Sequence, residues 1–193
     1  MSLQVKTSSG PVAQQEQTCL IRRGQPDDAA ALSAFAIRTF VDTYGEYNDP
    51  DNLRLHLAHS YGVGRQREEL GDPRVVTLLA DRDGQLAAFA QVRQGETPAC
   101  VRCEAAVELH RFYVDRLWHG TGVSHALLAQ ARRAALDLGA ATLWLKVWER
   151  NPRAIAFYAK SGFVDVGVAD FFVGRDRQTD RVLSLDLRAH RTA

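Results

Sequence analysis

Residues Glu108 to Leu138 read ELHRFYV, DRLWHGTGVSH and ALLAQARRAALDL, which predict a strand, a glycine turn and a helix. Apolar residues of the third part recur every three or four positions and share one helical face: Val123, Leu127, Ala131, Ala134 and Leu138. Gly120 and Gly122 precede this helix, where glycine permits positive φ and close approach of the backbone to a ligand. Free amides of the first helical turn form an anion site. A phosphate-binding loop is therefore predicted, although a merely connecting turn fits this segment equally well.

The sequence of this turn does not match the patterns of two common nucleotide-binding loops. The P-loop needs lysine and then serine or threonine after its last glycine, whereas Val123 and Ser124 follow Gly122. The dinucleotide fingerprint needs three glycines at fixed spacing, and the turn has two. The segment HGTGVS instead resembles the Arg/Gln-x-x-Gly-x-Gly/Ala loop of the GNAT family of acetyl-coenzyme A-dependent N-acetyltransferases. His119 and Ser124 depart from that pattern, but serine is small and histidine can donate a hydrogen bond to a phosphate.

A second motif strengthens the resemblance. Residues 143–148, LWLKVW, read as a strand, and residues 149–163, ERNPRAIAFYAKSGF, read as a helix with its caps. Asn151 is a good N-cap, Pro152 is favoured at the first helical position, and Gly162 suits the position after the helix. The segment is similar to the family's Asn-x-x-Ala-x-x-Phe-Tyr-x-x-x-Gly-Phe element, with every position filled. Both motifs together, in the family's order, are more specific than either alone.

The resemblance covers residues 20–187 and implies the family's fold. That fold is of the α+β class, a mixed and largely antiparallel sheet of about seven strands flanked by helices. The segment VWERNPRA and the later Gln178-Thr179-Asp180 look most like the branch that includes PaiA-type polyamine acetyltransferases. We expect a flexible tail at residues 1–18 and a single acetyltransferase domain at residues 19–190.

Net charge, apolar runs and cysteine count indicate which cellular compartment and which classes of partner to expect. A net charge of +1 gives no strong field to attract nucleic acid. No apolar run approaches the length of a membrane span, and the N-terminus lacks a secretory signal's apolar core. The odd number of cysteines favours a reducing cytosol, with Cys100 and Cys103 as unpaired thiols. We expect a cytoplasmic protein with no nucleic-acid or membrane partner, and a homodimer is left open.

Local patterns predict the remaining elements. A first strand at residues 20–23 leads into a helix with an apolar face made of Ala31, Leu32, Phe35 and Ala36, and a second helix follows at about residues 50–61. Residues 65–70 read as a charged, solvated segment. An Asp-Gly hairpin joins strands at residues 75–80 and 86–92, and a long central strand spans residues 105–114. The last strands are expected at residues 163–167 and 182–187, with a loop between them.

The resemblance also implies roles in binding acetyl-coenzyme A. The backbone amides of the loop are expected to wrap the pyrophosphate; its residues are His119, Gly120, Thr121, Gly122, Val123 and Ser124. The backbone of Phe112, Tyr113 and Val114 is expected to pair with the pantetheine arm like an added strand. Asn151 resembles a residue that hydrogen-bonds the coenzyme, and serving only as the helix cap is the alternative. Tyr158 matches the family's general acid, and a packed aromatic is its alternative.

The general base is left open between two side chains. Glu108 is the best carboxylate on the central strand and can act through a water, but an ordinary solvated strand residue fits as well. Strand alternation puts His110 on the same face unless a bulge intervenes, and family members often carry one here, so His110 remains a second choice. Lys146 and Trp148 shape the acceptor pocket or simply pack.

No metal is expected. His56 and His59 lie within one predicted helical turn, but a third protein ligand is not evident, and surface histidines explain the pair better.

The predicted reaction is direct attack of an uncharged amine on a thioester, which proximity alone favours by several kcal/mol. The expected acceptor is the primary amine of a polyamine or an amino-acid-like compound. Three carboxylates are available to attract a cationic acceptor: Asp42, Glu46 and Glu108. A peptide or protein N-acetyltransferase would instead need an open groove, and a non-catalytic acetyl-coenzyme A sensor would not need the acid at Tyr158.

Overall fold

The computed structural model describes residues 19–188. The predicted tail at residues 1–18 lies outside this range. Seven strands form one sheet in the order β1-β2-β3-β4-β5-β7-β6. The strands are β1 (Leu20–Arg23), β2 (Val75–Arg82), β3 (Gln85–Arg93), β4 (Ala106–Val114), β5 (Thr142–Trp148), β6 (Val164–Val173) and β7 (Asp176–Asp186). Every pairing is antiparallel except that of β4 with β5, so the predicted mixed, largely antiparallel sheet is confirmed.

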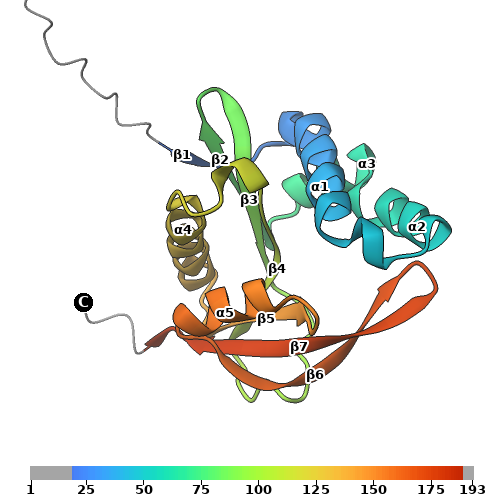
Figure 1. Ribbon diagram of the computed structural model, residues 1–193. Helices are drawn as coiled ribbons and strands as arrows, with labels where there is room; N and C mark the ends of the chain where they lie inside the picture. The colour runs from blue at the N-terminus through green and yellow to red at the C-terminus, as the bar shows by residue number, and fades with distance from the viewer. Residues whose placement is uncertain (1–18, 189–193) are drawn as a thin grey trace, which may run out of the picture.

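Helices cover the sheet from both sides (Figure 1). The helices are α1 (Ala29–Tyr44), α2 (Pro50–Tyr61), α3 (Val63–Gly71), α4 (Val123–Asp137) and α5 (Pro152–Lys160), with short 3-10 turns η1 (Pro26–Asp28), η2 (Gly45–Tyr47) and η3 (Arg116–Trp118). One apolar core joins α4 and α5 to the sheet, with Leu127 and Leu143 fully buried in it. A second core joins Leu32 and Phe35 of α1 to Phe89 of β3 on the other side. The cores fix the helices on opposite faces.

Strands β4 and β5 run in parallel and separate part of the way along. They pair only where Ala106–Glu108 meets Thr142–Trp144. A bulge lies at His110. The consecutive residues Val92 and Gln91 of β3 pair with Leu109 and Arg111 of β4, so His110 has no partner on β3. Bulges bend a strand and increase its local twist. From His110 onwards the edge of β4 that faces β5 therefore has no strand partner, and the sheet is open at that point.

The structure corrects the prediction for the last two strands. We expected a loop between residues 167 and 182, but β6 and β7 continue as one long hairpin to a turn at Gly174. Many polar residues of this segment lie at the start of β7, Asp176–Thr179, and resemble a loop because the strand pairs only with β6 there and is exposed or half-buried. A Cβ at Gly174 would lie 2.7 Å from backbone atoms of Asn52, so the turn packs directly on α2. That long-range contact has no local sequence signal.

Three predictions on the α1–α3 side were also wrong. Residues 65–70 form most of helix α3, and Glu69 is buried in an ion pair with Arg111 of β4. His56 is buried against the ring of Phe40, not a surface residue. Ala31 faces solvent, because α1 buries the positions around Leu32 instead. Each difference arises from packing between segments distant in sequence.

Within residues 19–188, no helix combines the length and the apolar character needed to cross a bilayer.

Candidate functional site

The glycine loop has the backbone geometry that the sequence predicted. Gly120 and Gly122 have φ values of 75° and 88°, in the left-handed region. Helix α4 begins immediately afterwards at Val123, so the unbonded amides of its first turn lie at the end of the loop. A Cβ at Gly122 would meet nothing within 4 Å, so backbone conformation and not space favours glycine here. This arrangement fits the binding of an anion such as a phosphate.

The side chain of His119 makes a hydrogen bond within the protein itself. Its Nε2 lies 3.0 Å from the carbonyl oxygen of Val114, so Nε2–H donates to the end of β4 and holds the loop there. Burial, and next Arg153, lower the pKa of His119, so its ring is neutral at pH 7. A neutral ring that donates from Nε2 has no second N–H for a phosphate. Arg153, exposed in the first turn of α5, is a cation that lines the cavity at this end.

A cavity of about 780 Å³ occupies the opening between β4 and β5. Its lining comes from both faces of the sheet. The α4–α5 side contributes His119, Gly120, Gly122, Ser124, His125, Asn151, Arg153, Ala154, Phe157 and Tyr158. The α1–α2 side contributes Phe40, Thr43, Tyr44, Asn48, His56, His59, Ser60 and Tyr61, and β7 contributes Gln178 and Asp180. Two molecules entering from opposite faces can therefore meet inside the sheet.

The structure brings Glu108, Phe112, Tyr113 and Val114 to the same cavity, whereas Thr121 and Val123 of the loop are not among its lining residues.

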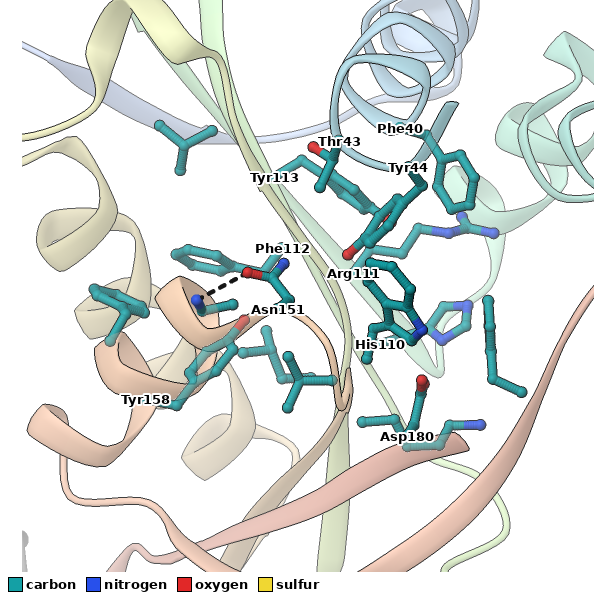
Figure 2. Close-up of a pocket in the computed structure, with 18 of the residues that line it drawn as sticks. Phe40, Thr43, Tyr44, His110, Arg111, Phe112, Tyr113, Asn151, Tyr158 and Asp180 are labelled. Carbon is teal, nitrogen blue, oxygen red and sulfur yellow. Dashed lines mark hydrogen bonds between the residues drawn. The ribbon is translucent and has the colours of Figure 1, made fainter. Parts of the chain in front are cut away.

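Asn151 and Tyr158 both face this cavity from α5 (Figure 2). The side-chain oxygen of Asn151 accepts a hydrogen bond of 3.1 Å from the amide of Ala154, which confirms the predicted N-cap. The ring of Tyr158 is buried against Phe112 and Phe163, and no residue between 19 and 188 hydrogen-bonds its hydroxyl. Burial, and to a lesser extent Tyr44, raise the pKa of Tyr158 well above its usual value. Its hydroxyl therefore keeps its proton at pH 7.

Glu108 and His110 lie together on β4, where Glu108 is buried, contrary to the solvated alternative, and His110 is half-buried. Glu108 Oε2 is 2.6 Å from Arg93 Nε and 3.6 Å from His110 Nδ1. Burial alone would raise the pKa of Glu108, but His110 and Arg93 outweigh it and hold that pKa at about 2. A carboxylate so acidic is a weak proton acceptor near neutral pH. Burial lowers the pKa of His110, so its ring is neutral at pH 7 and can accept a proton.

Asp180 of β7 is a site residue to which the sequence analysis gave no role, although it noted the segment Gln178-Thr179-Asp180. It lines the cavity and is only 5% exposed, and its Oδ1 is buried without a hydrogen-bond partner. Burial raises the pKa of Asp180 to about 6, against the opposing effect of Lys146 and with a smaller contribution from Glu149. Its side chain points into the cavity from below (Figure 2). The sequence signal was weak, since its position depends on the long β6–β7 hairpin.

The pKa of Asp180 makes the stability of the fold depend on pH. Because its folded-state pKa of about 6 exceeds the ordinary 3.8, its protonated form favours folding, and this contribution is lost as pH rises from about 4 to about 6. We expect Asp180→Asn to gain melting temperature relative to wild type as pH rises across that range. Buried histidines such as His56 act in the opposite direction, but equally in both proteins. Parallel melting curves from pH 4 to pH 8 would contradict the assignment.

Of the three carboxylates that the sequence suggested for attracting a cationic acceptor, only one lies at the cavity. Asp42 and Glu46 are exposed and do not line the cavity, whereas Glu108 does. Among residues 19–188, no cluster of three or more histidine, cysteine or acidic side chains is placed to hold a metal. Cys19, Cys100 and Cys103 are free thiols, as expected for the last two. None of these thiols lines the cavity, so it offers no cysteine nucleophile.

Comparisons with known proteins agree with this geometry. The model of the acetyltransferase (GNAT) family matches residues 37–163. Uncharacterized N-acetyltransferases of Mycobacterium bovis and Mycobacterium tuberculosis are 33% identical over 160 residues, covering 83% of this chain and 98% of theirs. An uncharacterized N-acetyltransferase of Lactobacillus delbrueckii is 26% identical over 81% of this chain and 90% of its own length.

Solved structures share the fold. The PaiA N-acetyltransferase from Thermoplasma acidophilum, in complex with coenzyme A, has a TM-score of 0.70 at 19% identity, covering 88% of this chain and 99% of that one. The structure of yncA from Salmonella typhimurium with its cofactor acetyl-CoA has a TM-score of 0.63 at 20% identity, covering 88% of this chain and 94% of that one. Both are similar in fold at low identity. With the family model matched over most of the chain, and with relatives one-third identical over nearly their full length, this chain belongs to the GNAT family of N-acetyltransferases.

Proposed function

We propose that the protein transfers the acetyl group of acetyl-coenzyme A to the primary amine of a small molecule, with both substrates held in the cavity at once. The observation that carries this proposal is the passage between β4 and β5, lined from both faces of the sheet. The glycine loop lies on one side of it, and the aromatic and acidic side chains of α1, α2 and β7 lie on the other.

The residues at the α4 side fit the coenzyme. The amides that follow Gly120 and Gly122 would hold the pyrophosphate, with the guanidinium of Arg153 beside them. The backbone of Phe112, Tyr113 and Val114 pairs with β3 on one edge and has no strand on the other. That free edge supports pairing with the amide groups of the pantetheine arm, as in strand addition. When bound there, the coenzyme supplies an acetyl group activated as a thioester.

The residues around the opening supply the proton transfers. A bond forms between the amine nitrogen and the acetyl carbon, and the carbon–sulfur bond breaks. His110 accepts the proton lost by the amine, with Glu108 and Arg93 orienting and balancing it. The hydroxyl of Tyr158 donates a proton to the departing sulfur. We therefore propose His110 as the base and Glu108 as a positioning residue, because Glu108 is paired with Arg93 and its pKa is low.

A panel of acceptors tests the proposal. Purified protein is incubated with acetyl-coenzyme A and, separately, with polyamines, amino acids and short peptides, and products are identified by mass spectrometry. We expect an acetylated small amine that requires the protein and acetyl-coenzyme A. Acetylation of peptides alone would overturn the small-molecule assignment, and the absence of any acetylated product would overturn the activity.

A further inference from the structure

Asp180 differs from the other carboxylate of the cavity in having no cation within ion-pair distance among residues 19–188. Glu108 is paired with Arg93 at 2.6 Å. Asp180 is buried, lines the cavity, and has no ion pair or hydrogen bond for its Oδ1 among residues 19–188. Leaving a buried carboxylate without a partner is costly, so such groups are normally neutralised by a nearby cation. A cationic group on a bound molecule would supply that partner.

The register of the sheet places Asp180 beside a cluster of aromatic side chains. Asp180 of β7 is directly opposite Trp148 of β5, so their side chains share one face of the sheet. The ring of Trp148 lies 5.8 Å from that of Tyr44 and 5.1 Å from that of Tyr47, measured between centroids. A carboxylate next to aromatic rings is a favourable site for an ammonium group, because the ring faces also attract cations.

Lys146 adds a charge of opposite sign next to this site. It lies two residues before Trp148, on the same face of β5, and it lines the cavity. No carboxylate among residues 19–188 lies within ion-pair distance of its ammonium group. It is near enough to Asp180 to lower the pKa of that carboxyl. A molecule with several positive charges would be repelled by Lys146, whereas one carrying a carboxylate would be attracted.

We propose that Asp180 receives the amino group of the acceptor and Lys146 receives a carboxylate of the same molecule, so the acceptor is amino-acid-like and not a polyamine. This inference rests on the proposed acetyl transfer and names the substrate class for it. A carboxylate and an ammonium group on neighbouring strands, neither in an ion pair within residues 19–188, line one cavity with the rings of Tyr44 and Trp148 and match the two charges of such a compound.

Matched substrates and variants test each half of the proposal. Each amino acid is compared with the amine that remains when its carboxyl group is removed, and spermidine represents the polyamines. Initial rates give kcat/KM for wild type, Asp180→Asn and Lys146→Gln. Asp137→Asn is the control, since Asp137 is exposed at the end of α4 and outside the cavity. Calorimetric titration with coenzyme A shows that each variant keeps the coenzyme site.

We expect wild type to favour at least one amino acid over its matched amine by about 10-fold or more, the effect of one charged hydrogen bond. In assays at pH 8, where Asp180 stays ionised without Lys146, Lys146→Gln should remove that preference and leave the matched amine unchanged. Asp180→Asn should lower kcat/KM for both by about 10- to 100-fold. Coenzyme A should bind all variants equally, and the control should match wild type.

The outcomes separate the two proposals. If spermidine or the matched amines are better substrates than every amino acid, or if Lys146→Gln affects both substrate types equally, the inference is wrong while the acetyltransferase activity stands. If Asp180→Asn leaves kcat/KM unchanged, the carboxylate does not bind the amine. If no amine of any class is acetylated although coenzyme A binds, the proposed activity itself fails.

Discussion

Tyr158→Phe is expected to lower kcat for acetyl transfer about 100-fold or more and to leave KM for acetyl-coenzyme A nearly unchanged. In the proposed mechanism, the substitution removes the proton that Tyr158 donates to the departing sulfur. It preserves the ring, which packs against Phe112, Phe157 and Phe163. Because no residue between 19 and 188 hydrogen-bonds the hydroxyl, no buried partner is left unsatisfied, and stability should change by less than about 1 kcal/mol.

Tyr61→Phe provides the matched control. Tyr61 is another buried tyrosine of the cavity, and its hydroxyl, unlike that of Tyr158, has a hydrogen-bond partner, the hydroxyl of Tyr113 at 3.0 Å. Steady-state kinetics and thermal melts of both variants compare the effects. Tyr61→Phe should keep kcat close to wild type. A Tyr158→Phe enzyme with the kcat of wild type would remove Tyr158 from the proton transfer and leave the departing sulfur to be protonated by solvent or another residue.

Gly122→Val is expected to weaken the binding of coenzyme A by about 10- to 100-fold. Valine is strained at the observed φ of 88°, so the loop would move to a conformation with negative φ. The amides at the start of α4 would then turn away from the pyrophosphate. Space is not the cause, because a Cβ at this position would touch nothing.

Gly139→Val separates this effect from a general loss of stability. Gly139 has a φ of 83°, also has open space around its missing Cβ, and lies at the other end of α4, outside the cavity. Both variants should lose similar stability, but only Gly122→Val should lose affinity for coenzyme A in calorimetric titrations. Equal affinity in Gly122→Val and wild type would place the pyrophosphate elsewhere.

Features with local causes could be read from the sequence. The side chain of Asn151 caps its own helix, Pro152 starts that helix, and the positive φ at Gly162 ends it. The glycines of the loop likewise act on their own backbone, so the strand, loop and helix around residues 108–138 were predicted nearly in register. The short 3-10 turn at Arg116–Trp118, capped by Asp115, was not.

Features that depend on distant partners could not be read in this way. Glu69 looked solvated because the sequence does not reveal that it meets Arg111 inside the fold. Asp180 became a site residue only through its register with Trp148, which is set by a hairpin whose turn packs on α2. The low pKa of Glu108 has the same origin, since His110 and Arg93 set it and Arg93 lies on another strand.

The measurement that tests the account most directly is the initial rate of acetyl transfer over a grid of acetyl-coenzyme A and acceptor concentrations. If both substrates occupy the cavity between β4 and β5 together, double-reciprocal plots should intersect. Intact protein mixed with acetyl-coenzyme A alone should then carry no acetyl group, because no cysteine among residues 19–188 lines the cavity. Parallel plots with an acetylated protein would show a two-step exchange through an enzyme nucleophile and contradict direct transfer.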